Sequence, residues 1–161
     1  SSTTTIKPGQ PATITATVSP AGTAIQWYKN GIAVPGATGT TLVVSVADYG
    51  IYTAEATTGA GCKALSNSVD ITAAASSIVY VYPNPSAGQF QVRVYNSPGK
   101  LLTLAVYNDL GQGVYRQVVN TSAPYTRMDV DIRNKAAGRY IVKVTNDEGT
   151  EIGSKPIIIV H

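Results

Sequence analysis

The fold is decided at the stretch Tyr82-Pro83-Asn84-Pro85-Ser86-Ala87-Gly88-Gln89-Phe90. Each proline fixes its own φ angle and holds the residue before it extended, while Gly88 can adopt a positive φ angle. Residues 78–82 are apolar and β-prone, and apolar and polar residues alternate over 89–95. The stretch therefore predicts a stiff corner between two β-strands.

The composition predicts an all-β protein. The 161 residues include 15 Gly, 9 Pro and 10 Tyr, and only 13% are charged, which favours strands and turns over helices. This length suits one or two small domains, and no apolar run approaches the roughly 20 residues of a membrane-spanning helix, so no membrane insertion is predicted. The chain starts at Ser1 without a signal peptide, so we expect it to be part of a longer protein.

The net charge of +3 lies in the second half of the chain. Nine of the 12 basic residues and six of the nine acidic residues follow residue 76. The basic residues alternate with acidic ones and form neither a run nor a basic helix, so nucleic acid is not a predicted partner.

Residues 1–75 are predicted to form a first β-sandwich. Apolar and polar residues alternate with a period of two in several short segments separated by turn residues, which is the spacing of a sandwich. These segments predict strands at residues 13–18, 25–28, 41–44, 51–54 and 67–73.

Within this domain, Trp27 lies on an early strand, and Asp48-Tyr49-Gly50-Ile51-Tyr52 has the spacing D-x-G-x-Y. The domain resembles an immunoglobulin-like domain, with Trp27, Asp48, Gly50 and Tyr52 as the residues that carry the resemblance. The resemblance implies that the Tyr52 hydroxyl bonds the backbone upstream and that Trp27 is a core residue. The usual disulfide is missing, because Ala16 and Ala54 stand where the two cysteines would be.

A second interpretation of the first domain is a carbohydrate-binding or adhesive module. Exposed aromatic rings stack on sugars, so Trp27 is an alternative platform, and Tyr28 and Tyr49 are further candidates for an exposed face. Polysaccharide is therefore kept as an alternative partner of this domain. The single Cys62 cannot form an internal disulfide. It is expected in a loop or at a strand end, and covalent pairing with another chain is the alternative.

Residues 76–161 are predicted to form a second β-sandwich, after a linker of small uncharged residues at 72–77. Two turns in this domain, Asn108-Asp109-Leu110-Gly111 and Asn146-Asp147-Glu148-Gly149, share one hairpin design. About seven strands are predicted, at residues 78–82, 89–95, 101–107, 113–119, 126–132, 139–145 and 155–160.

The second domain also carries a set of short motifs in a specific order. They consist of Tyr82, Pro83, Asn84, Pro85, Gly88 and Phe90 in the corner, Leu110 and Gly111 in a turn, Gly138, Tyr140, Val142 and Val144 in one predicted strand, and finally Lys155. With these motifs the domain resembles the type A C-terminal sorting domain of proteins exported by the type IX secretion system of Bacteroidetes-type bacteria. The resemblance covers about half of the chain.

The resemblance implies a transport signal rather than an enzyme. It implies recognition by the outer-membrane translocon and its shuttle protein, passage through the periplasm, and removal of the signal by a sortase-like signal peptidase. The product would be secreted or held at the cell surface. The linker at 72–77 is the predicted region of cleavage.

The last predicted strand is the candidate recognition strand, with Lys155, Ile157, Ile158, Ile159 and Val160. Its four consecutive branched apolar residues make both faces apolar, although a two-layer sandwich buries only one. Ile158 and Val160 are then left for a partner, as a hydrophobic patch or through edge-strand addition, unless the linker or the first domain covers them.

No catalytic, cofactor or metal site is predicted. The only histidine, His161, and the only cysteine, Cys62, lie in different halves, and no nucleophile, phosphate-loop or metal-ligand motif occurs. Asp129 and Asp131 share one strand face with arginines, which indicates a solvated face of mixed charge. Any catalytic domain is expected upstream of this chain.

Overall fold

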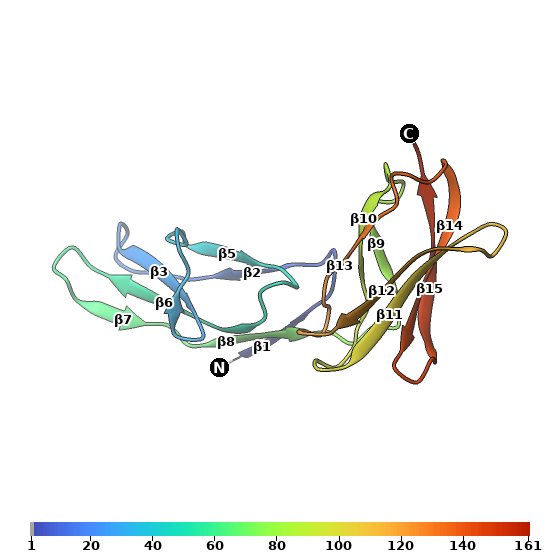
Figure 1. The fold of residues 1–161 in the computed structure, drawn as a ribbon. Coiled ribbons are helices and arrows are strands. Elements are labelled where there is room, and N and C mark those ends of the chain that lie inside the picture. Colours follow the sequence, from blue (N-terminus) through green and yellow to red (C-terminus); the bar gives the residue numbers. More distant parts are fainter. Residues whose placement is uncertain (1) are drawn as a thin grey trace. The chain divides into compact units, whose positions relative to one another are not determined.

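The computed structural model describes residues 2–161; Ser1, the first residue of the predicted first domain, lies outside this range. The chain divides into two compact units, the first ending at Ala74 and the second running from Ala75 to His161 (Figure 1). All regular elements of residues 2–161 are strands, so this part of the chain has no helix of the length and apolarity that crossing a membrane requires. The predicted all-β fold with two tandem sandwiches is confirmed.

The first unit is a sandwich of a large and a small sheet. The large sheet has the order β1-β8-β6-β3-β4, with β7 paired to β6, and the small sheet pairs β2 with β5 (Figure 1). The strands are β1 (Ser2–Ile6), β2 (Ala12–Thr15), β3 (Ala24–Lys29), β4 (Ile32–Ala33), β5 (Thr41–Val44), β6 (Gly50–Thr57), β7 (Lys63–Leu65) and β8 (Val69–Ala73).

The core of this unit follows from the alternation in its strands. In β2, Ala12 and Ile14 are buried while Thr13 and Thr15 are exposed, as the pleat of a strand with one covered face requires. The first strand of this unit was not predicted. The sequence indicated no strand before residue 13, but β1 pairs in parallel with β8, from Ser2 opposite Val69 to Ile6 opposite Ala73.

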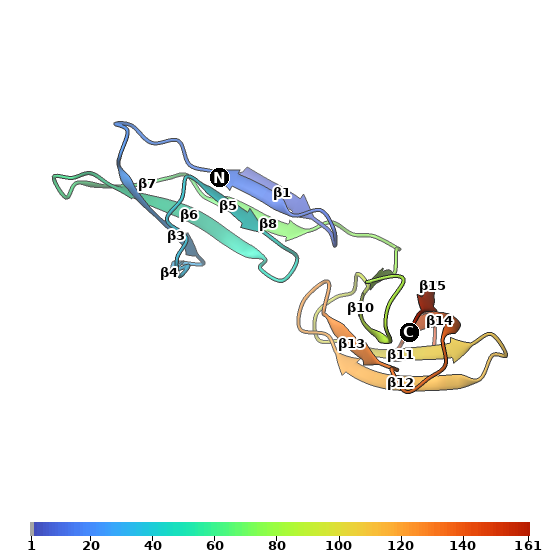
Figure 2. The ribbon, with the colours of Figure 1, turned by 90° about the horizontal axis from the view of Figure 1, so that it is seen from above.

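The second unit has seven strands in two sheets, one of order β13-β10-β9 and one of order β12-β11-β14-β15. Figure 2 shows β11 and β12 as long neighbouring strands, in agreement with their antiparallel register. The strands are β9 (Tyr80–Tyr82), β10 (Gln89–Arg93), β11 (Leu101–Asn108), β12 (Gly113–Asn120), β13 (Met128–Asp131), β14 (Gly138–Asn146) and β15 (Glu151–Ile159).

The inward faces of these two sheets form one apolar core. The four-stranded sheet contributes every second residue of its central strands, and the three-stranded sheet contributes Phe90 and Val92 from β10 and Met128 and Val130 from β13. The buried residues of the larger sheet include Leu102, Leu104, Val106, Val142, Val144, Ile157 and Ile159.

The two similar turns of the second unit have the shared design that their sequences predict. The Oδ1 atom of Asn108 accepts hydrogen bonds from the amides of Leu110 (3.1 Å) and Gln112 (2.9 Å). The Oδ1 atom of Asn146 accepts the equivalent bonds from Glu148 (3.1 Å) and Thr150 (2.8 Å). The glycines that close these turns have φ angles of 75° at Gly111 and 78° at Gly149, which other residues adopt only with strain.

Candidate functional site

The corner is tied to the last strand by the side chain of Asn84. Its Nδ2 atom donates a hydrogen bond to the carbonyl of Pro156 (3.0 Å), and its Oδ1 atom accepts one from the amide of Ile158 (3.1 Å). These groups of β15 face away from β14, so the Asn84 amide takes the place of a neighbouring strand. Two parts of the chain that lie more than 70 residues apart in sequence thus meet at one edge.

Ser86 extends this contact through its backbone. Its amide donates to the carbonyl of Ile158 (2.9 Å), and its carbonyl accepts from the amide of Val160 (2.9 Å). Its hydroxyl donates to the Gln89 carbonyl and accepts from the Gly88 amide, and the residue is buried. Sequence reasoning missed Ser86 because a backbone contact to a distant strand leaves no local pattern.

These contacts decide between the two ways in which β15 could meet a partner. The outer edge from Pro156 to Val160 already has hydrogen-bond partners in Asn84 and Ser86, so it is not open for edge-strand addition. The side chains, however, divide as predicted. Ile157 and Ile159 are fully buried, whereas Ile158 is 41% exposed and Val160 is 47% exposed.

The exposed side chains continue as an apolar row across the four-stranded sheet. Tyr107 of β11 lies opposite Ile141 of β14, and Ile141 lies opposite Pro156 of β15. Ile158 follows Pro156 by two residues and therefore points to the same face. We call Ile141, Pro156, Ile158 and Val160 the terminal patch.

Gly88 fixes the other side of the corner against the segment after β13. Its φ angle is +94°, and a Cβ atom there would lie 2.7 Å from Cα of Arg133 and 2.9 Å from its amide nitrogen. The Gly88 carbonyl accepts a hydrogen bond from the amide of Ile132 (2.8 Å). No residue with a side chain fits at this position without movement of the backbone.

The chain resembles known proteins in both units. Residues 80–159 match the family described as "Secretion system C-terminal sorting domain", and residues 1–73 match the family described as "Immunoglobulin domain". The second unit is a type IX secretion C-terminal sorting domain. It follows an immunoglobulin-like domain, in the order that the sequence predicts.

No curated protein matches the chain. Among solved structures, the amphioxus IgVJ-C2 molecule is 14% identical, with 98% of this chain and 100% of that chain covered and a TM-score of 0.39. The titin domains z1z2 in complex with telethonin are 19% identical, with 99% and 91% covered and a TM-score of 0.37. The fibronectin(III)-like modules of Clostridium thermocellum CbhA are 17% identical, with 94% and 85% covered and a TM-score of 0.32.

The family match implies export to the medium or the cell surface and contact with the type IX secretion machinery. Immunoglobulin-like and sorting domains are both non-catalytic families. The two matches together support the C-terminal region of a secreted protein.

The other predicted motif residues of the sorting domain separate into core and turn positions. Phe90, Val142 and Val144 are buried, and the buried Tyr140 donates from its hydroxyl to the carbonyl of Ala136 (2.8 Å). Leu110 and Gly111 form the tip of the hairpin between β11 and β12, and Gly138 has a φ angle of +154°. Lys155 is exposed on β15. The corner meets the last strand at one edge, and Gly138 at the start of β14 lies opposite Ile159 of that strand.

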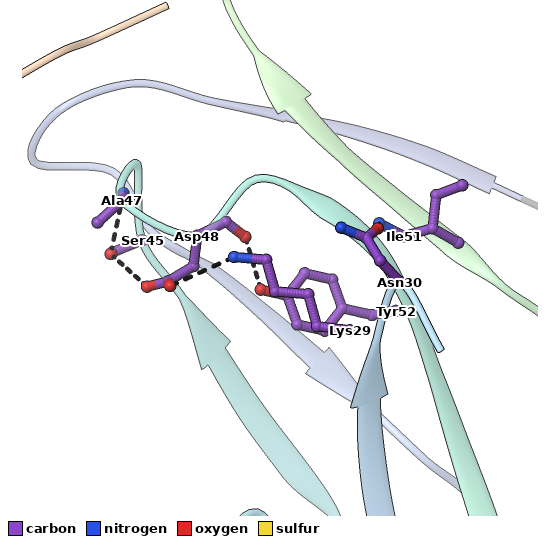
Figure 3. Close-up of polar contacts among 7 residues, drawn as sticks. All are labelled: Lys29, Asn30, Ser45, Ala47, Asp48, Ile51 and Tyr52. Atoms are coloured by element: carbon purple, nitrogen blue, oxygen red, sulfur yellow. Dashed lines mark hydrogen bonds and ion pairs between the residues drawn. The ribbon is translucent and has the colours of Figure 1, made fainter. Parts of the chain in front are cut away.

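The immunoglobulin-like domain has the tyrosine corner that the resemblance implies (Figure 3). The Tyr52 hydroxyl donates to the carbonyl of Asp48 (2.5 Å), and the Asp48 carboxylate pairs with Lys29 (3.4 Å). Glycine is favoured at position 50 beside it, because a φ angle of +149° strains other residues and a Cβ atom there would lie 2.9 Å from Oδ1 of Asn30. Tyr140 makes the same bond to the residue four positions before it, and a G-x-Y spacing precedes both bonds, at Gly50 and at Gly138.

Trp27 is a core residue and not a sugar platform. It is 3% exposed, and its Nε1 atom donates to the carbonyl of Gly39 (2.9 Å). Ala54 is buried next to it in the same cluster, and Ala16 packs against that cluster. A hollow of about 340 Å³ is lined by all three residues, where the resemblance would place a disulfide.

Replacing Tyr52 with phenylalanine tests the tyrosine corner. Burial, assisted by the Asp48 carboxylate, raises the pKa of Tyr52 to about 12, above the value of about 10 in an unfolded chain. The stabilisation is complete below about pH 10 and falls as the pH rises towards 12, because the Tyr52 hydroxyl of the unfolded chain then loses its proton first.

Tyr52→Phe should lower the free energy of unfolding by about 1 kcal/mol at neutral pH. It should also weaken the loss of stability at alkaline pH. Urea unfolding followed by Trp27 fluorescence at about pH 8 and about pH 11 measures both effects. An equally steep alkaline loss in the variant would assign it to other groups.

Replacing Asn84 with alanine tests the contact between the corner and the last strand. The change removes two hydrogen bonds at an exposed edge, where water can replace them, and should cost about 1–2 kcal/mol. Hydrogen exchange should become faster at the Ile158 amide, which loses its acceptor. Asn134→Ala, at another exposed asparagine of the same domain, is the control and should leave that amide unchanged.

Proposed function

We propose that the sorting domain is read by the outer-membrane translocon and its shuttle protein through the terminal patch, after passage through the periplasm. The immunoglobulin-like domain then serves as a spacer between this signal and the upstream part of the protein. A sortase-like peptidase removes the signal, and the product is released or held at the cell surface. The family match supports transport as the role of the domain.

One observation carries the choice of surface: Asn84 joins the corner directly to the last strand. The corner and the last strand are the first and last parts of the predicted motif. The remaining motif residues lie in the core or in a turn, except Gly138, which begins β14 opposite Ile159. Two parts of a motif that is spread over the sequence thus meet at one edge of the domain. A partner that binds this surface therefore reads a folded domain and not a linear peptide.

The terminal patch has the chemistry of a protein-binding surface. Ile158 and Val160 expose branched apolar side chains, and Pro156 beside them is also exposed. Because each side chain is already partly covered, burying the remainder at an interface contributes about 1 kcal/mol per side chain. Arg139 of β14 lies opposite Ile158, so the patch has a basic side chain beside it.

Serine substitutions at Ile158 and Val160 test the proposal, with the complete chain fused to a secreted reporter in a host that has type IX export. Both side chains are exposed, so Ile158→Ser with Val160→Ser should leave the domain folded and should reduce export at least about tenfold. The folded reporter should then accumulate in the periplasm. Leu101→Ser with Val118→Ser removes two other exposed apolar side chains of the same sheet and should be exported normally. Normal export of the folded patch variant would overturn the proposal.

The proposed removal of the signal has its own test. The linker region contains small uncharged residues between the last strand of the first unit and β9, so a protease can reach an extended chain there. Mass spectrometry of the exported protein should find a C-terminus upstream of Tyr82. An exported protein that still contains residues 82–161 would show that the domain is retained.

A further inference from the structure

A groove of about 450 Å³ lies on the outer face of the three-stranded sheet of the sorting domain. The register places Tyr82 of β9, Gln91 of β10 and Asp129 of β13 in one row across all three strands. A second row pairs Gln89 with Asp131. The terminal patch belongs to the other sheet, so the groove is a separate surface of the same domain.

Two tyrosines line the groove, Tyr82 from β9 and Tyr115 from β12, the edge strand of the other sheet. Tyr82 is 69% exposed, and an accessible tyrosine ring offers an apolar surface with a polar tip. Tyr115 of β12 also lines the groove, and its hydroxyl lies 3.1 Å from Oε1 of Gln117 and 3.3 Å from the carbonyl oxygen of Asp129. Burial and the nearby carboxylates of Asp129 and Asp131 raise the pKa of Tyr115, so it remains a neutral hydroxyl.

The rest of the groove consists of planar polar side chains that are hydrogen-bonded to one another. Arg127 Nε donates to Asp129 Oδ1 (2.7 Å), and Arg133 donates to Asp131 Oδ2 (2.7 Å). Gln89 Nε2 also donates to Asp131 Oδ2 (3.2 Å). These bonds from Arg133 hold the pKa of Asp131 at about 2, so both members of that pair stay charged and compensate each other.

The ion-paired polar groups and the exposed tyrosine ring together indicate which class of ligand fits the groove. The carboxylates are matched by arginines, so the groove has little net charge with which to attract an ion. Amide, carboxylate and guanidinium groups have several donors and acceptors, which suits a ligand with many hydroxyl groups. The exposed ring of Tyr82 adds an apolar surface for the C–H face of a sugar ring.

We propose that this groove binds a neutral polysaccharide, with one sugar ring against Tyr82 and its hydroxyls bonded to Gln91 and Asp129. The proposal goes beyond export, because it gives the sorting domain a ligand of its own. It also places saccharide binding in the second domain, whereas the sequence suggested the first.

Binding of the purified complete chain to soluble polysaccharides tests this proposal without any export assay. The probes are laminarin, yeast mannan and galactomannan, compared by affinity electrophoresis and calorimetry. At least one should bind, and Tyr82→Ala should weaken that binding about tenfold or more, as the loss of a stacking contact does. Tyr82→Trp keeps an aromatic ring and should restore binding. Gln91→Ala should also weaken it, independently of the aromatic position.

The control is Tyr28→Ala in the immunoglobulin-like domain, which should leave the affinity unchanged. Thermal unfolding of each variant shows that the sorting domain is intact, as expected for an exposed tyrosine. The proposal is overturned if none of the three polysaccharides binds, if Tyr82→Ala binds as tightly as the natural chain, or if Tyr28→Ala is the variant that loses binding. None of these results would affect the role of the terminal patch in export, which serine substitutions on the other sheet test.

Discussion

Replacing Trp27 with alanine is expected to unfold the immunoglobulin-like domain and to leave the sorting domain folded. Truncating a fully buried tryptophan costs about 3–5 kcal/mol, while small domains are stable by only about 5–15 kcal/mol. Here Trp27 packs beside Ala54 in a core without a disulfide, which in other domains contributes about 2–4 kcal/mol. The change also leaves the Gly39 carbonyl without the Nε1 donor.

Far-UV circular dichroism during urea unfolding measures this effect. On addition of urea, the natural chain should lose the circular dichroism signal of β structure from both domains. In Trp27→Ala, the signal of the first domain should be absent before urea is added. Trp27→Phe is the control, because it keeps an aromatic ring and loses mainly the bond to Gly39, at a cost of about 1–2 kcal/mol. If Trp27→Ala kept the full signal and the same urea midpoint, the tryptophan would not be central to this core.

Replacing Gly88 with alanine is expected to destabilise the sorting domain by about 2–5 kcal/mol. The new methyl group adds the strain of a positive φ angle, about 1–3 kcal/mol, to a collision with the backbone of Arg133. That backbone cannot move freely, because the next residue back, Ile132, donates its amide to Gly88 and is buried.

The matched control is Gly149→Ala in the turn between β14 and β15. Gly149 has a φ angle of +78°, but a methyl group added there would have no neighbouring atom within 4 Å. Only the backbone strain applies, so the cost should be about 1–2 kcal/mol. Seven of the ten tyrosines lie in the sorting domain, so near-ultraviolet circular dichroism reports mainly on it. Equal losses in the two variants would show that the close approach to Arg133 relaxes without cost.

Local chemistry made much of the sorting domain predictable from sequence. Its predictable features are set by residues only a few positions apart in sequence. They are the alternation in its strands, the Asn and Gly positions of two hairpins, and the corner residues. The division of the last strand into buried and exposed residues follows from its period of two, and Ile157 to Val160 obey it.

Contacts between distant segments could not be predicted in this way. The bonds from Asn84 to Pro156 and Ile158 join residues 72 and 74 positions apart, and nothing near Asn84 indicates them. The strand β1 was missed because its threonines show no apolar alternation and its pairing with β8 is parallel and distant. The strand predicted from residue 126 begins at Met128, because Thr126 Oγ1 accepts the amides of Ser122 and Ala123 in a turn.

The bridge from Asn84 and Ser86 to the final strand has a consequence for biosynthesis. The ribosome makes the corner first, and its hydrogen-bonding partners emerge only when residues 156–160 have been translated. A polypeptide that terminates prematurely thus lacks the assembled signal, however well its earlier parts fold. Under the proposed recognition of the terminal patch, only chains translated through residues 156–160 would be exported.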